Sequence, residues 1–358
     1  MTLVAKFEIH YNRFLNSEGE VVQELPDFAK NINTLIDTYR YMTLVRVFDT
    51  KAVALQRTGK MGTYAGILGQ EAVSTAAGQV MRADDAFFPS YREYGAMLLR
   101  GVKMSDLFAY WGGDERGSDF ANKDDFPLCV PIASQFLHAT GTAYAFKYRK
   151  QDRVAVTMCG DGGTSKGDFY EALNLAGDWQ LPVVFLINNN QWAISVPRSA
   201  QTHTQTLAQK AIAAGIPGEQ VDGNDVIAVR YAVENAIAKA RRGEGPTLIE
   251  AITYRLCDHT TADDAKRYRD DAEVEQAKRE EPLIRLRAYL MKQDAWSDDA
   301  EKQLLQECSE KVEQAVQEYL DMPSQAPTAM LDYLYAELPI AYQDQWDEIA
   351  QMTVPVGH

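Results

Sequence analysis

Two apolar runs, separated by a glycine-rich turn and a helical pattern, place the strongest constraint on how this chain folds. Residues 153–159 (RVAVTMC) and 181–188 (LPVVFLIN) are apolar runs of strand length, which is typical of strands buried on both faces. Between them, residues 160–167 supply turn residues, and residues 169–179 carry apolar side chains at helical spacing. A strand, a helix and a strand in this order form a right-handed unit with parallel strands.

Further segments extend this unit into a doubly wound parallel sheet of the α/β class. Apolar spacing predicts helices at 34–57, 70–81 and 226–242, and strands at 86–88 and 246–256. A capping box, Ser165-x-x-Asp168, is predicted at the start of the helix that follows the glycine turn. The expected organisation is a loosely structured N-terminal arm at 1–33, an α/β domain at 34–272 and a C-terminal helical extension at 273–358.

Composition excludes several classes of function. The chain has 51 acidic and 36 basic residues, a net charge of −15, which argues against nucleic-acid binding. No apolar run approaches the roughly 20 residues of a membrane span. The N-terminus lacks the pattern of a secretory signal, and the four cysteines have no CxxC spacing. We therefore expect a cytoplasmic protein with free thiols, without a membrane or nucleic-acid partner.

Polar residues follow both central strands. The first strand ends in Gly160-Asp161-Gly162 and the second in Asn188-Asn189-Asn190. Because parallel strands present their carboxyl ends at one edge of a sheet, Asp161 and Asn190 are expected to face one point. A carboxylate and an amide oxygen suit Mg²⁺, and glycines allow the backbone to approach a diphosphate. Alone, Gly-Asp-Gly is more often a turn than a site, but its pairing with the asparagine run favours a functional site.

The same residues carry a family resemblance. Gly-Asp-Gly followed some 30 residues later by Asn-Asn is similar to the thiamin diphosphate signature. The stretch 160–195 resembles the alpha subunits of two-subunit 2-oxo acid dehydrogenases, and the likeness runs from about residue 30 to 340. It implies the thiamin-diphosphate-binding fold, with thiamin diphosphate and Mg²⁺ as cofactors. It assigns Asp161 and Asn190 as side-chain metal ligands, Trp192 as a backbone-carbonyl ligand, and Gly160, Gly162 and Gly163 as neighbours of the diphosphate.

Two further segments match the family. The segment 87–95 (FFPSYREYG) resembles the loop whose Tyr-Arg pair binds the diphosphate, here Tyr91 and Arg92. Arginine suits this role because its planar fork meets phosphate oxygens in pairs. The segment 129–135 (CVPIASQ) resembles the part that holds the aminopyrimidine, with Val130 contributing backbone and Ile132 an apolar wedge. Without the resemblance, Tyr91-Arg92 would be read as a surface pair and Ile132 as a core residue.

His259 is the predicted catalytic residue. It lies in RLCDHTTADDAKRYRD (255–270), which resembles the family's active-site loop, and it also contacts the cofactor in that comparison. A histidine with a near-neutral pKa can transfer a proton as the acyl group passes to a lipoyl group. Cys257 and Asp258 stand where some relatives carry a second histidine. Thr260 and Thr261 are taken as unmodified residues, and Arg255, Asp263, Asp264, Tyr268 and Arg269 as residues that order the loop.

The resemblance also implies partners. No glutamate here sits in a recognisable context for activating the aminopyrimidine, and the family supplies that carboxylate from its beta subunit. The expected assembly is a heterotetramer of two alpha and two beta chains that delivers its acyl group to a lipoyl-bearing acyltransferase core. Such a chain is expected to be inactive alone.

Pyruvate is the expected substrate, from the likeness of 160–171 and of 215–225 to bacterial pyruvate-type chains. A branched-chain 2-oxo acid dehydrogenase and an acetoin-cleaving relative remain alternatives. In the glycine-rich stretch Gly62-Thr63-Tyr64, Thr63 stands at the middle position, where relatives often carry an aromatic residue. A catalytically silent assembly subunit would be expected to lack the metal ligands or His259. A nicotinamide dehydrogenase would need GxGxxG after the first strand, and that motif is absent.

Overall fold

Parallel strands form a central six-stranded sheet in the computed structural model, which describes residues 1–352. From edge to edge the order is β1 (Tyr11–Asn12), β7 (Gly218–Asp222), β8 (Thr247–Ile252), β4 (Val183–Asn189), β3 (Ala155–Gly160) and β2 (Ala86–Phe88). Every neighbouring pair is parallel. The predicted α/β class with a parallel sheet is confirmed. Residues 353–358 of the predicted C-terminal extension lie outside the described residues.

The central strands serve two hydrophobic cores at once. In β3, Val156 and Met158 belong to one core, whereas Ala155 and Cys159 belong to the other. Successive side chains of a strand point to opposite faces, so a sheet covered on both sides needs apolar residues at every position. This arrangement explains the uninterrupted apolar runs in the sequence.

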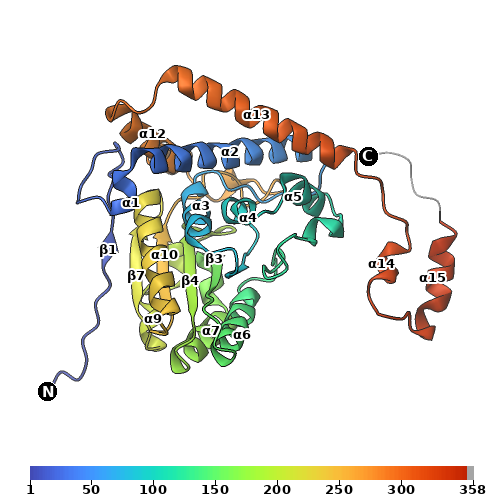
Figure 1. Cartoon of the computed structure of the whole chain (residues 1–358), viewed down its shortest axis with the longest axis horizontal. Coiled ribbons are helices and arrows are strands. Elements are labelled where there is room, and N and C mark those ends of the chain that lie inside the picture. The colour runs from blue at the N-terminus through green and yellow to red at the C-terminus, as the bar shows by residue number, and fades with distance from the viewer. Residues whose placement is uncertain (353–358) are drawn as a thin grey trace.

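Helices cover both faces of the sheet (Figure 1). One core contains residues of α2 (Ile32–Arg57), α3 (Glu71–Val80) and α10 (Val226–Arg241), and the other contains residues of α6 (Ser134–Tyr148) and α7 (Gly167–Asp178). The shorter elements between them are α1 (Asp27–Lys30), α4 (Tyr94–Leu99), α5 (Met104–Trp111), α8 (Arg198–Gln201), α9 (Lys210–Ala213) and the antiparallel pair β5 (Trp192–Ala193) and β6 (Val196–Pro197).

The C-terminal part is helical, as expected. After α11 (Asp271–Lys278), helices α12 (Pro282–Lys292) and α13 (Asp298–Leu320) pack on α2, and α13 runs alongside it (Figure 1). Helices α14 (Ala329–Asp332) and α15 (Gln343–Ala350) lie beyond the end of α13, away from the sheet. Within residues 1–352, no helix combines the length and apolar character needed to cross a membrane. The division at residues 33 and 272 stays a prediction.

Two local expectations were wrong. The N-terminal arm is more ordered than expected: β1 joins the edge of the sheet beside β7, and the backbone N–H groups of Phe14 and Leu15 donate to the Asp225 carboxylate over 2.7 and 2.8 Å. A two-residue strand is too short to leave a periodic pattern. The capping box is also absent. Residues 161–165 form a 3-10 helix, so α7 begins at Gly167 with Lys166 at its N-cap and no side-chain cap.

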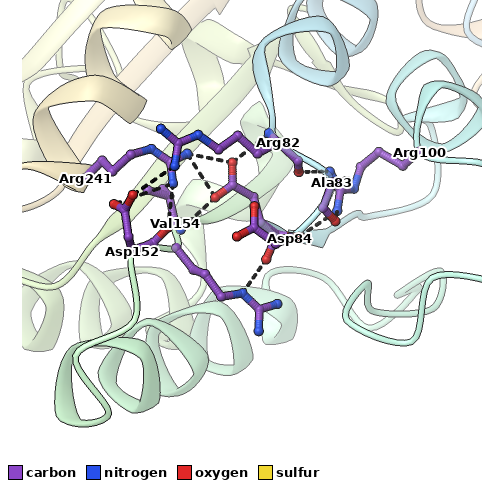
Figure 2. Close-up of polar contacts among 9 residues, drawn as sticks. Arg82, Ala83, Asp84, Arg100, Asp152, Val154 and Arg241 are labelled. Atoms are coloured by element: carbon purple, nitrogen blue, oxygen red, sulfur yellow. Dashed lines mark hydrogen bonds and ion pairs between the residues drawn. The ribbon is translucent and has the colours of Figure 1, made fainter.

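A network of ion pairs and hydrogen bonds fixes the opposite, amino-terminal ends of β2 and β3 (Figure 2). The fully buried Asp85 accepts from the backbone of Val154 at 2.9 Å and from Arg241 at 2.8 and 3.0 Å. Arg241 also donates to the carbonyl of Asp152 at 2.9 Å, and Arg100 donates to the carbonyl of Arg82 at 3.0 Å. These contacts tie α10 to the base of the sheet and leave its carboxyl edge free for a site.

Candidate active site

A cavity of about 310 Å³ opens at the carboxyl ends of β3 and β4. It brings together most of the residues expected from the sequence: Tyr91, Arg92, Ile132, Gly160, Asp161, Gly162, Gly163, Asn190, Trp192 and His259. Val130 is half-exposed and does not line the cavity. These residues come from five separate segments of the chain.

The strand register places Asp161 and Asn190 just beyond the ends of two neighbouring strands, and both line the cavity. Gly160, the last residue of β3, pairs with Asn188 in β4, so the two residues follow neighbouring strand ends. Asp161 is 1% exposed, and its carboxylate accepts from the side-chain amide of Gln201 in α8. Burial raises the pKa of Asp161, whereas the Gln201 hydrogen bond opposes that shift. A buried carboxylate with one neutral donor is suited to receive a cation.

The side chain of Asn190 is held from both ends. Its Nδ2 donates to Oε1 of Gln70 at 2.8 Å, and its Oδ1 accepts from the backbone N–H of Trp192 at 3.2 Å. An amide oxygen has two lone pairs, so Oδ1 keeps one for a ligand. These two contacts orient the amide, with the oxygen toward the turn that leads into β5.

The carbonyl of Trp192, expected as a metal ligand, is occupied by another group. It accepts from Nη1 of Arg255 at 3.2 Å, and the indole N–H donates to the Tyr254 hydroxyl at 3.2 Å. The carbonyl retains a second lone pair. Its role as a ligand stays a prediction.

Two glycines bring the backbone close to its neighbours. A Cβ at Gly162 would lie 2.7 Å from Cβ of Ala193, and one at Gly163 would lie 2.8 Å from Sγ of Cys159. Neither position has room for a side chain. The turn after β3 thus presents bare backbone to the cavity, as a site that approaches phosphate closely requires.

Arg92 is a buried residue of the site, since it is 8% exposed. It donates from Nη1 to the Gly66 carbonyl and from Nη2 to the His259 carbonyl. Its guanidinium carbon lies 5.2 Å from the centroid of the Tyr91 ring. The pair is therefore packed against the cavity wall, where a cation attracts an anionic ligand far more strongly than at a solvated surface.

His259 faces the same cavity and is held by its own loop. Its backbone N–H donates to Oδ2 of Asp263 at 2.9 Å, and the Tyr268 hydroxyl donates to the same carboxylate. Burial lowers the pKa of His259 to about 4, and the positive charges of Arg92 and Arg255 add to that effect. The imidazole is consequently neutral near pH 7.

Arg255 lies fully buried behind the loop. It donates to the Ile194 carbonyl and to the Tyr268 hydroxyl, both at 2.8 Å, in addition to Trp192. Burial lowers its pKa. These contacts join the loop that carries His259 to the turn after β4, which agrees with the ordering role expected for Arg255 and Tyr268.

Several lining residues were missed, namely Gln70, Ser90, Glu93, Lys166, Asn188 and Ile194. Glu93 is buried, its Oε2 accepts from the backbone N–H of Arg92 at 3.0 Å, and burial raises its pKa to about 7. Because Glu93 directly follows Tyr91-Arg92 in the sequence, it could have been predicted as a residue of the site. Gln70 gave none, since a glutamine before a small-residue helix carries no pattern of its own.

The residues fit a magnesium diphosphate. Among residues 1–352 there is no group of three or more His, Cys, Asp or Glu side chains that could hold a metal. Mg²⁺ does not need one, because it commonly takes one or two protein side chains and completes its shell with phosphate and water. Asp161 and Asn190 offer suitable oxygens, the turn at Gly162 and Gly163 offers bare backbone, and Arg92 offers a positive charge.

Comparison with known proteins agrees with this geometry. The family described as dehydrogenase E1 component matches residues 39–328. A curated protein of Staphylococcus epidermidis named pyruvate dehydrogenase E1 component subunit alpha is 37% identical over 347 residues, which is 96% of this chain and 93% of the relative. A protein of the same name from Staphylococcus aureus shows the same identity and coverage.

Proposed function

Because the chain belongs to the dehydrogenase E1 component family, we propose that it is the alpha subunit of a pyruvate dehydrogenase decarboxylase component. In this function it decarboxylates pyruvate together with a beta subunit and passes the acetyl group to a lipoyl-bearing acyltransferase. The observation that carries the proposal is the convergence of Asp161, Asn190, Arg92 and His259 on one cavity at the carboxyl edge of the sheet. A silent assembly subunit would have no need to retain all four.

Thiamin diphosphate and Mg²⁺ are the proposed cofactors. Thiamin diphosphate, when bound, supplies the electron-accepting ring that decarboxylation of a 2-oxo acid requires. Asp161 and Asn190 would hold the cation through their side-chain oxygens, with the Trp192 carbonyl as a third ligand. Arg92, Tyr91 and the backbone at Gly160, Gly162 and Gly163 would hold the diphosphate, and Val130 and Ile132 the aminopyrimidine.

His259 would handle a proton at the acyl-transfer step. Nδ1 of its imidazole faces the guanidinium of Arg92, which can only donate, so the neutral ring carries its proton on Nε2. In this tautomer the Nε2–H group can donate a hydrogen bond toward the lipoyl sulfur as the acyl group passes to it, and it can give up its proton there only when Nδ1 gains one. The hydrogen bond to Asp263 holds the loop in place for this exchange.

The beta subunit is the proposed source of the activating carboxylate, in a heterotetramer of two alpha and two beta chains. Glu93 is a carboxyl group of this chain in the cavity, but it is bonded to the backbone of Arg92, at the end of the site proposed for the diphosphate. We therefore do not assign it to the aminopyrimidine. All four cysteines are free, which accords with the cytoplasm that we propose as the location.

The test is an activity measurement on the co-purified alpha and beta chains. Ferricyanide reduction is followed with thiamin diphosphate and Mg²⁺, comparing pyruvate, 3-methyl-2-oxobutanoate and acetoin. Pyruvate is expected to give the highest kcat/KM, and Asp161→Ala to abolish turnover. Asp37→Ala, an exposed aspartate of α2, serves as the control and should retain full activity.

Each contrary result has a distinct meaning. Preferential turnover of the branched-chain acid or of acetoin would overturn the pyruvate assignment and keep the family chemistry. A complex that binds the cofactor but turns over none of the three substrates would overturn the catalytic assignment in favour of a silent subunit.

A further inference from the structure

Gln70 is a buried residue of the cavity that none of the roles above includes. It lies at the N-cap of α3, immediately after Gly69, whose φ of +87° turns the chain sharply into the helix. Its backbone N–H donates to the Ile67 carbonyl at 2.8 Å, which closes that turn. The side chain is 2% exposed and lines the cavity beside Asn188 and Asn190.

The oxygen of Gln70 is used twice. Oε1 accepts from Nδ2 of Asn188 at 3.1 Å and from Nδ2 of Asn190 at 2.8 Å. Asn188 is itself fixed, since its Oδ1 accepts from the Thr253 hydroxyl at 2.6 Å. A continuous set of hydrogen bonds therefore runs from Thr253, directly after β8, through Asn188 in β4 to the N-terminus of α3. Because both lone pairs of Oε1 are taken, the direction of the Gln70 amide is determined.

The nitrogen of Gln70 is left without a partner. Nε2 is buried and forms no hydrogen bond with any residue between 1 and 352. Buried amide groups are nearly always satisfied, because an unpaired donor loses its bonds to water and gains nothing in return. In a cavity built around an anion, such a donor is suited to an oxygen of that anion.

We propose that Gln70 is a positioning residue that serves both halves of the magnesium diphosphate. Its amide oxygen holds the amide nitrogen of Asn190, so that Asn190 presents its oxygen to the cation. Its amide nitrogen donates a hydrogen bond to an oxygen of the diphosphate. This inference rests on the proposed cofactor and adds to it a residue outside the strand-end signature.

Two substitutions separate the two contacts. Gln70→Glu keeps an oxygen that can accept from Asn188 and Asn190, but it removes the donor and adds negative charge toward the diphosphate. Gln70→Met has similar size and removes both contacts. Gln79→Met is the matched control, because Gln79 lies on the same helix, is bonded to Thr38 and does not line the cavity.

The measurement is isothermal titration calorimetry on the alpha–beta complex, with thiamin diphosphate at saturating Mg²⁺ and with Mg²⁺ at saturating thiamin diphosphate. A hydrogen bond to a charged group corresponds to roughly 10- to 100-fold in Kd. Gln70→Glu is expected to weaken thiamin diphosphate binding by at least that factor. Gln70→Met is expected to weaken both Mg²⁺ and thiamin diphosphate.

The outcomes distinguish this inference from the proposed function. If the wild-type complex does not bind thiamin diphosphate, the cofactor assignment itself fails. If it binds and Gln70→Met, folded and assembled like Gln79→Met, has unchanged affinities, the positioning role is overturned. If Gln70→Met does not fold, Gln70→Glu is the deciding variant. Should it bind thiamin diphosphate as tightly as wild type does, the proposed hydrogen bond from Nε2 of Gln70 to the diphosphate is overturned.

Discussion

Nδ1 of His259 lies 3.0 Å from Nη2 of Arg92, and the same guanidinium nitrogen donates to the His259 carbonyl. One arginine thus contacts both the ring and the backbone of the histidine, although 167 positions separate them in the sequence. The positive charge of Arg92, the residue proposed to bind diphosphate, thereby adds to burial in disfavouring protonation of His259. This coupling makes the ionisation of His259 a sensitive measure of what occupies the site.

The free chain should contain a neutral His259 over an unusually wide pH range. Its pKa is lowered to about 4 by burial and by two arginines. The folded pKa is below the unfolded value, so between those two pH values the unfolded chain binds more protons, and stability from this group falls as the pH drops. NMR titration of the imidazole should give a midpoint near 4. A midpoint at or above the ordinary value of about 6.5 would contradict the buried, arginine-paired ring.

Cofactor binding should raise that midpoint. An anionic diphosphate beside Arg92 offsets the positive charge that disfavours protonation, so the pKa of His259 should move upward when thiamin diphosphate and Mg²⁺ are added to the alpha–beta complex. The same NMR titration measures it, with thiamin, which lacks phosphate, as the control ligand. An equal shift with thiamin would show that the diphosphate does not lie near Arg92.

Asp161→Asn should separate stability from function. Burial raises the pKa of Asp161, so its charged form costs folding free energy at neutral pH, and the cost grows as the pH rises through the folded pKa. The asparagine variant of the free chain should be at least as stable as wild type in thermal unfolding. Its complex should bind Mg²⁺ at least 100-fold more weakly, on the order of 2.7 kcal/mol. Asp37→Asn is the control, and an unstable Asp161→Asn chain would argue for a structural carboxylate.

Gly162→Ala should weaken cofactor binding by a steric route that a second substitution relieves. The new methyl group would lie 2.7 Å from Cβ of Ala193, so the turn after β3 or strand β5 must shift. We expect at least a tenfold rise in the Kd of thiamin diphosphate. The double variant Gly162→Ala, Ala193→Gly removes the opposing methyl and should recover most of the affinity. No recovery would mean that the added methyl meets the ligand rather than Ala193.

Asp85→Asn should destabilise the fold and leave the site intact. The substitution keeps the size of the side chain but leaves Arg241 without its buried counter-charge, at a cost of about 3 kcal/mol. Asp152→Asn, at an exposed position of the same network, should cost less than about 1 kcal/mol. Urea unfolding measures both. Equal stability of the two variants, or a changed cofactor affinity for Asp85→Asn, would contradict a purely structural role.

The central sheet and the proposed metal-binding pair, Asp161 and Asn190, could be predicted from the sequence because local patterns indicate them. Strands β3 and β4 are buried on both faces, so their apolar runs could be recognised without knowledge of their neighbours. Asp161 and Asn190 follow the ends of those strands directly, and parallel neighbours end at one edge. In contrast, β1 and β7 are short and partly exposed, and their pairing joins residues about 200 positions apart.

Only the tertiary structure determined which hydrogen bonds the side chains around Asp161 and Asn190 form. Gln70 meets Asn190 across 120 positions, and Arg255 reaches Trp192 across 63, and neither contact leaves a periodic signal. The directions of these side chains depend on which donors and acceptors surround them after packing. A sequence determines where its strands end because burial acts on each segment locally. The hydrogen bonds that complete the site form between distant segments, so they exist only once the sheet and its helices have come together.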